Sequence, residues 1–283
     1  MQRIIHSALG ALLLCLSLPA QTLVFPHVVD GQGWQSTIVL TNTTATPASA
    51  TLVFHKETTG GNTAAWTPPF IEVVSTAGLS LTGGSTMFLH TVGTAADLSQ
   101  GWAELNADPG VIGYLVFTNR ASGHQNDGTA PAAPSSGRIL VPYDDSSGSF
   151  TGIAISNPTA ADQSVTVGFR TTTGGVALGA PFTVPAFGHT SFVLSQKFTV
   201  IAGHEGLAEF YSATGNLSMI ALRFNPTLAF TSAPVYFQSG SPLITTGSST
   251  DPNNPYDPTN PGPYDPYNPY GTLYMNQSAR GVH

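Results

Sequence analysis

A motif that occurs twice is the feature that most restricts how this chain can fold. The stretch Phe25–Asn42 reads FPHVVDGQGWQSTIVLTN, and a weaker copy, VPYDDSSGSFTGIAISN, occupies Val141–Asn157. Each copy has a short apolar strand with a proline, then a turn of Gly, Ser or Asp residues, and then a strand closed by asparagine. A motif that returns once with matching neighbours predicts two copies of one domain.

Matching residues keep nearly constant separations along the two copies. Asn42 and Asn157 are 115 residues apart, and so are Phe54 and Phe169. The separation between matching residues then decreases by about ten in the loop that holds Trp66. Beyond this loop the separations are 104 to 106 residues, for the pairs Phe88–Phe192, Gly101–Gly206, Glu104–Glu209 and Asn119–Asn225.

Composition indicates the class of secondary structure. Charged residues make up 8% of the chain and hydrophobic residues 41%, so almost no window could form a helix with a charged outer face. Each copy instead contains short strand-like segments with turn signals about every 8–12 residues, which is typical of a sandwich. We therefore predict an all-β fold with two tandem Ig-like antiparallel β-sandwich domains, followed by a disordered Pro/Tyr/Asn-rich tail.

The predicted boundaries follow changes in composition. We expect a signal peptide at 1–20, a first β-sandwich repeat at 22–120 and a second at 139–238. The segment between them, 121–138, is rich in Gly, Pro, Ser and Ala without apolar periodicity, and it predicts a linker. Residues 239–283 are predicted to form a low-complexity disordered tail.

The N-terminal residues are typical of an exported protein. Arg3 supplies a positive start, Ala8–Leu18 is an apolar run too short to span a membrane, and Ala20 gives a small residue at the expected cleavage point. We therefore predict a secreted protein, extracellular or associated with the cell surface, without a membrane span after cleavage. The single cysteine, Cys15, lies within this run, and lipid anchoring through it is a second option. Cleavage would leave a mature protein without disulfides.

Charge and motifs exclude several classes of function. The chain carries 8 Lys+Arg and 15 Asp+Glu with no basic cluster, which argues against a nucleic-acid partner. We recognise no hydrolase elbow, phosphate loop, dinucleotide fingerprint or zinc motif. We therefore predict no enzymatic activity, no catalytic residue, no cofactor and no metal; a surface polysaccharide or a protein is the expected partner.

The tail has an unusual repeated composition. Asp251–Tyr270 reads DPNNPYDPTNPGPYDPYNPY, and proline at nearly every third position opposes both helix and sheet ladders. An extended chain with polyproline character is expected. Four tyrosines of this segment are predicted to dock on a partner: Tyr256, Tyr264, Tyr267 and Tyr270. The alternative is that the segment serves only as a solubilising spacer.

The motif also resembles a known group of proteins. With Gly101–Glu104 (GWAE) and Tyr114–Phe117 (YLVF) downstream of it, the chain resembles a poorly characterised family of secreted bacterial proteins built from tandem β-sandwich repeats, with a FPxVVDGxGWxxTxxLxN-type motif. The resemblance covers roughly Leu23–Arg120, and Ile139–Pro226 more loosely. It implies the fold and an extracellular location, and it brings no established catalytic residues.

Several acidic residues have two interpretations. Asp30, Asp144 and Asp145 lie in turns, where they could bind Ca²⁺ or form Asx-turns; their spacing matches no known calcium loop, which favours the turns. Glu104 and Glu209 occupy equivalent places in the two copies. A shared structural role therefore explains them more simply than a glycosidase pair.

The three tryptophans all lie in the first copy. Trp34 and Trp66 adjoin loop residues, where an exposed ring could stack on a sugar. Trp34 is open to a core role or a ligand-binding role, Trp66 equally so, and Trp102 is expected in the core. Three functions follow: surface attachment or assembly, carbohydrate binding through Trp66 and Trp34, and hydrolysis at an unrecognised site. We favour the first.

Overall fold

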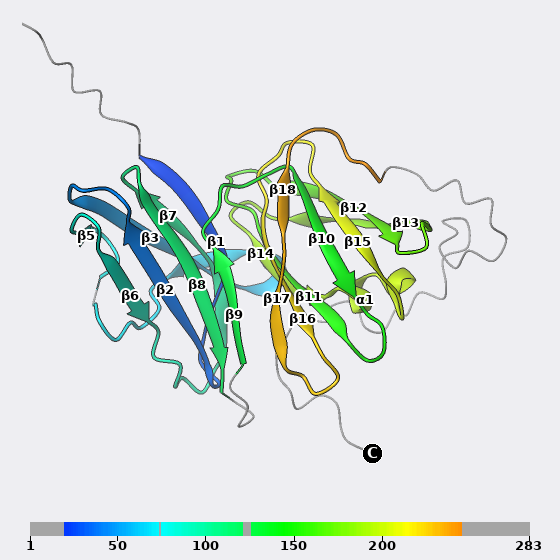
Figure 1. The fold of residues 1–283 in the computed structure, drawn as a ribbon, viewed down its shortest axis with the longest axis horizontal. Coiled ribbons are helices and arrows are strands. Elements are labelled where there is room, and N and C mark those ends of the chain that lie inside the picture. Colours follow the sequence, from blue (N-terminus) through cyan, green and yellow to red (C-terminus); the bar gives the residue numbers. More distant parts are fainter. Residues whose placement is uncertain (1–19, 74, 121–125, 245–283) are drawn as a thin grey trace, which may run out of the picture.

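A computed structural model describes residues 20–73, 75–120 and 126–244 of the chain (Figure 1). The fold is all-β, as predicted, with antiparallel sheets arranged as a sandwich in each half of the chain. The expected signal peptide and most of the expected tail, including its four tyrosines, lie outside the described residues.

The first half contains two sheets. One has the strand order β1-β7-β3-β4, with β5 also paired to β3, and the other has the order β6-β2-β8-β9. A 3₁₀ turn at Thr59–Gly61 joins β3 to β4. The strands are β1 (Gln21–Asp30), β2 (Trp34–Asn42), β3 (Ala48–Glu57), β4 (Thr63–Trp66), β5 (Leu79–Leu81), β6 (Thr86–His90), β7 (Ser99–Ala107), β8 (Val111–Asn119) and β9 (Asn126–Pro131).

The second half repeats this arrangement. Its sheets have the orders β13-β12-β15-β10-β18 and β14-β11-β16-β17. A short helix, α1 (Leu194–Lys197), and a 3₁₀ turn at Thr199–Ile201 follow β14. The strands are β10 (Arg138–Asp144), β11 (Phe150–Ser156), β12 (Gln163–Thr171), β13 (Val176–Val184), β14 (His189–Val193), β15 (Glu205–Tyr211), β16 (Ser218–Phe224), β17 (Phe230–Ala233) and β18 (Tyr236–Gln238).

The order of the strands is the same in the two halves. When β1 is matched with β10, β2 with β11, β3 with β12 and β7 with β15, each sheet of one half maps onto a sheet of the other. Gly101 and Gly206 occupy the same register position, opposite Lys56 and Thr171. A Cβ there would lie 1.9 Å and 2.1 Å from a carbonyl oxygen of the neighbouring strand, so both sites require glycine.

The asparagines that end the repeated motif have the same hydrogen bonds. Asn42 Nδ2 donates to the carbonyl of Thr46, and Asn157 Nδ2 donates to that of Ala161, each at 2.7 Å. Both amides also donate to carbonyls at the end of a neighbouring strand, and both Oδ1 atoms accept from the threonine two residues later. Both side chains are fully buried. This shared network explains why the motif ends in asparagine.

One sequence match is out of register. Phe88 was aligned with Phe192, but Val39 pairs with Phe88 while its counterpart Ala154 pairs with Ser191. Phe88 is therefore outward and 50% exposed, whereas Phe192 is buried. The true counterpart of Phe192 is Leu89, which points inward, because successive residues of a strand face opposite sides of the sheet.

The segment predicted as a linker contains a strand. Asn126–Pro131 forms β9 and pairs with β8 along its whole length. Next to β9 lies β17 of the second half, where Ser232 Oγ donates to the carbonyl of Thr129 and accepts from its N–H, both at 2.6 Å. The linker prediction was wrong for this part because Gly128 and Ala130, which face inward here, left no visible apolar periodicity.

The core of the first half is completed by the second half. The outer face of sheet β14-β11-β16-β17 packs against β1 and β9 and supplies apolar side chains to the first core. The ring of Trp34 stacks on that of Phe230, with centroids 5.6 Å apart and planes at 23°. The two predicted tandem domains therefore do not have separate cores on this side. The contributing residues are Ala154, Ile220, Leu222, Phe224 and Phe230.

We expect Phe230→Ala to destabilise the first half, although residue 230 belongs to the second. Deletion of this buried ring should lower the free energy of unfolding by about 3 kcal/mol and shift the emission of Trp34. Urea unfolding followed by tryptophan fluorescence measures both effects, since all tryptophans lie in the first half. Phe182→Ala, in the second core, should leave the folded emission unchanged. Unchanged emission in Phe230→Ala would contradict a shared core.

We also expect Asn157→Ala to cost about 2 kcal/mol of unfolding free energy, because buried carbonyls and a threonine lose their partner. Asn62→Ala is the matched control, since Asn62 is exposed and donates only to the carbonyl of Thr59. Its effect should stay within about 0.5 kcal/mol. Chemical denaturation of both variants measures the two free energies of unfolding. Equal losses of unfolding free energy would show that the buried network contributes no more to stability than the exposed hydrogen bond of Asn62.

Candidate functional site

A loop of the second half docks on the outer face of the first. Phe187, between β13 and β14, has a positive φ of 52°, which turns its backbone towards β7. Its carbonyl accepts hydrogen bonds from Trp102 Nε1 at 2.8 Å and Thr63 Oγ1 at 2.7 Å. Its ring is parallel to that of His55, with centroids 5.8 Å apart, and His55 stacks in turn on Trp102 at 4.1 Å. The first half thus binds an aromatic residue presented by a turn.

A polar chain beside this loop also crosses between the halves. Glu57 Oε2 lies 2.7 Å from His189 Nδ1, and His189 Nε2 lies 3.2 Å from His27 Nδ1. Gln100 Nε2 donates to Glu57 and, at 3.3 Å, to Ser191 Oγ. Both histidines are buried. Polar groups from both halves therefore meet at one site, in which the two histidines are buried and Glu57 and Gln100 are partly exposed.

His27 reaches this site through an irregularity in β1. Phe25 pairs with Ala103 and Val28 with Gly101, so β1 has one more residue than β7 over this interval. Such a bulge re-aims a side chain and accommodates Pro26, which cannot donate to the ladder. Burial, and next the neighbouring His189, holds the pKa of His27 well below its usual value. The imidazole of His27 is therefore neutral in the folded protein.

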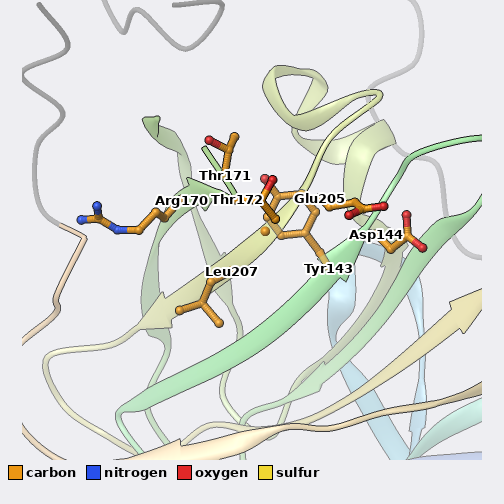
Figure 2. A pocket seen from close by; sticks show the side chains of 8 residues that line it. Tyr143, Asp144, Arg170, Thr171, Thr172, Glu205 and Leu207 are labelled. Atoms are coloured by element: carbon orange, nitrogen blue, oxygen red, sulfur yellow. The ribbon is translucent and has the colours of Figure 1, made fainter. Parts of the chain in front are cut away.

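The second half has an open hollow at the equivalent place, with a volume of about 470 Å³ (Figure 2). It lies where β10, β12 and β15 meet. Four first-half residues contact the loop or the adjoining strand β14, and they correspond by strand register to four residues of the hollow. The first-half residues are His55, Glu57, Gln100 and Trp102. The residues of the hollow are Arg170, Thr172, Glu205 and Leu207, joined by Tyr143 and Asp144.

The charges in the hollow are arranged on two sides. Figure 2 shows Arg170 extending away from the carboxylates of Asp144 and Glu205. Glu205 Oε1 accepts from Ser146 Oγ at 2.7 Å, and Asp144 Oδ2 lies 2.6 Å from an Arg223 nitrogen. The exposed Arg170 guanidinium has no ion pair or hydrogen bond within the described part of the chain. A ligand with one anionic group and one hydroxyl donor would match this arrangement.

Asp144 is ionised in this environment. Partial burial acts to raise the pKa of its carboxyl, but hydrogen bonds from Ser146 N–H and Oγ and the nearby Arg223 guanidinium together outweigh burial, so the pKa lies below its usual value. The Ser146 N–H contact, two residues ahead, is an Asx-turn. An ionised, paired carboxylate is suited to binding and is a poor general acid.

The other two aspartates also serve loops. Asp30 Oδ1 accepts from the N–H of Gly93 at 2.7 Å. Its counterpart Asp145 accepts from the N–H of Gly203 at 2.9 Å and from the hydroxyl of Ser195. Turn chemistry, rather than Ca²⁺ binding, is what these contacts favour. In the described ranges no group of three or more His, Cys, Asp or Glu side chains is arranged to hold a metal ion.

The tryptophans do not form one platform. Trp34 is 2% exposed beneath Phe230, so the structure favours its core role over its ligand-binding role. Trp102 is fully buried, but it lies outside the first core: its ring stacks on His55 and its Nε1 donates to the carbonyl of Phe187, so the expected core position was wrong. Trp66 is half-buried on the edge strand β4, with its ring edge-on to Phe54 at 6.2 Å. Trp66 alone of the three keeps a substantial exposed surface.

Glu104 and Glu209 are both held by structural contacts. His55 Nε2 lies 3.5 Å from Glu104 Oε1, and this contact lowers the pKa of Glu104 against the opposing effect of partial burial. Glu209 is 1% exposed; Arg138 Nε donates to it at 2.6 Å, and so do the backbone N–H groups of Leu243 and Ile244. Glu209 therefore holds residues 243 and 244 against the sheet.

The chain matches no protein-family model and no curated protein, so membership of the secreted repeat family remains a prediction. Within the ranges 20–73, 75–120 and 126–244, no helix is long and apolar enough to cross a membrane.

Sequence reasoning missed the residues that form the docking sites. Four of them were not singled out: His27 lies in the repeated motif but matches no catalytic or metal-binding pattern, and no motif marks His189, Phe187 or Arg170. The alignment of the repeats could have drawn attention to Arg170, since it replaces His55 at a matched position. Phe187 could not be found in this way, because its importance depends on which face the second half turns towards the first.

We expect the stability of the protein to fall as the pH drops below about 6.5, the usual pKa of histidine. His27 accepts a proton in the unfolded chain but resists protonation when folded, so the unfolded state is favoured by up to about 1.4 kcal/mol per pH unit. His27→Gln should flatten this dependence, whereas Asn62→Ala, at an exposed residue that does not titrate, should not. Urea unfolding at pH 5.0, 6.0 and 7.5 measures it; an unaltered slope in His27→Gln would refute the assignment.

Proposed function

We propose that the protein is a secreted, non-enzymatic β-sandwich repeat protein that acts in attachment or assembly outside the cell or at its surface. The observation that carries this proposal is that one docking site occurs twice. In the first half the site holds a loop of the same chain, and in the second half its counterpart is an open hollow.

The side chains of the hollow support binding rather than turnover. Asp144 and Glu205 are each hydrogen-bonded within the protein, and Arg170 faces solvent. The apolar leader with Arg3 and the small residue Ala20 supports export. On this proposal the tail after Ile244 connects the sandwiches to a surface or partner.

A carbohydrate-binding module is the second candidate, and the exposed part of Trp66 is the observation that favours it. A ring on an edge strand can stack on a sugar at the rim of the sheet. Trp34 no longer contributes to this candidate, because Phe230 covers its ring.

A pull-down assay distinguishes the two candidates. Labelled protein is mixed with isolated cell envelopes and with insoluble cellulose or chitin. Attachment through the hollow predicts envelope binding that falls at least fivefold in Arg170→Glu and is unchanged in Trp66→Ala. Sugar binding predicts the reverse pattern on polysaccharide. Absence of envelope binding by the unaltered protein would refute the proposal.

A further inference from the structure

The filled site of the first half shows what kind of group the hollow is built to hold. There, the aromatic ring of Phe187 lies parallel to that of His55, and the Phe187 carbonyl accepts a hydrogen bond from Trp102. In the hollow, Arg170 replaces His55; a guanidinium is also planar and also stacks on aromatic rings. Leu207 replaces Trp102, so this position still offers an apolar surface but no longer has an indole N–H to donate to a bound backbone. The hollow thus fits an aromatic residue whose own side chain, rather than its backbone, makes the polar contacts.

The C-terminal segment already runs over the same face of the sheet. Ile244 packs on Gly168, where a Cβ would lie 2.5 Å from its side chain. Glu209 binds the N–H groups of Leu243 and Ile244, and Leu207 of the hollow is two residues from Glu209 on β15. This step corresponds to about 7 Å. The chain is therefore delivered to the edge of the hollow.

The chain that follows Ile244 is long enough to enter the hollow. The structure describes the chain as far as Ile244, and 39 residues follow. Tyr256 comes 12 residues after Ile244 and Tyr264 comes 20, whereas an extended chain of 12 residues spans up to about 40 Å. Both tyrosines can reach the hollow, and the intervening segment can form a loop.

The tail also carries the matching chemistry. Tyrosine is followed by aspartate twice, at Tyr256-Asp257 and Tyr264-Asp265. A phenol can donate its proton to the carboxylate of Glu205, and the adjacent aspartate can pair with Arg170 on the opposite side (Figure 2). We propose that the hollow binds a Tyr-Asp pair of the chain's own tail.

A weak contact is sufficient for this arrangement. A covalent connection of 12 to 20 residues gives the tyrosines an effective concentration in the millimolar range at the hollow. In the absence of a competing partner the hollow therefore fills even when a free peptide would bind only at millimolar concentration. The contact lies within one chain and does not depend on the proposed function. An external partner that presents the same Tyr-Asp chemistry would compete for the hollow.

Photo-crosslinking of the full chain tests this inference. Benzoylphenylalanine replaces Tyr256 or Tyr264, and mass spectrometry locates the adduct. We expect intramolecular adducts on peptides that contain Tyr143, Arg170 or Leu207. The yield should fall at least fivefold in Arg170→Glu and stay unchanged in Arg120→Glu, a charge reversal at an exposed first-half residue. Adducts elsewhere, no effect of Arg170→Glu, or adducts only in covalent dimers would each overturn the proposal.

A charge swap tests the pairing itself. Asp257→Lys together with Asp265→Lys should reduce the yield as Arg170→Glu does, and the three substitutions combined should restore at least half of it. Failure of the combined variant to recover would overturn the Arg170 contact. Unfolding curves confirm that each variant folds, and binding to cell envelopes is measured separately, so the two proposals fail independently.

Discussion

The packing of one β-sheet between two cores is the constraint on which this structure depends. The inner face of sheet β14-β11-β16-β17 encloses the second core, while its outer face closes the side of the first sandwich between β1 and β9. A sheet that is apolar on both faces cannot be left exposed on either without a large loss of buried surface. The two halves are therefore coupled through Ile220, Leu222 and Phe230, although each has the strands of a complete sandwich.

The same packing brings chemistry to the boundary between the halves. Once the outer face of the second half covers β1, the loop at Phe187 reaches His55, and His189 reaches Glu57 and His27. His27 is neutral there because burial penalises its charged form. The second half keeps the equivalent positions without a neighbour to fill them, and they form the hollow around Arg170. Duplication followed by divergence has thus produced a filled site and an open one.

Much of the fold was predictable from local patterns. The separation of Asn42 and Asn157 indicated two equivalent units, and the structure gives both residues one hydrogen-bond network. Low charge and closely spaced turn signals indicated strands throughout. Two predictions failed because the residue types do not reveal which face of the sheet they occupy. In β9 one of the inward positions is a glycine, so no apolar alternation is visible. The match of Phe88 to Phe192 overlooked a one-residue difference in register between the two halves. The docking sites were not predictable, since their members come from distant parts of the chain.

By itself, the sequence determined the all-β class and the presence of two equivalent units, because low charge, closely spaced turn signals and constant separations between matching residues can be read along the chain. The need for glycine at Gly101 and for asparagine at Asn42 became clear only from contacts with distant strands. Only the tertiary structure decided that Trp34 is covered by Phe230, that the halves share a core, and that Arg170 faces an open hollow. Each of those outcomes depends on how one sheet is oriented against another. That orientation is set by the summed packing of many side chains, and no single stretch of the chain encodes it.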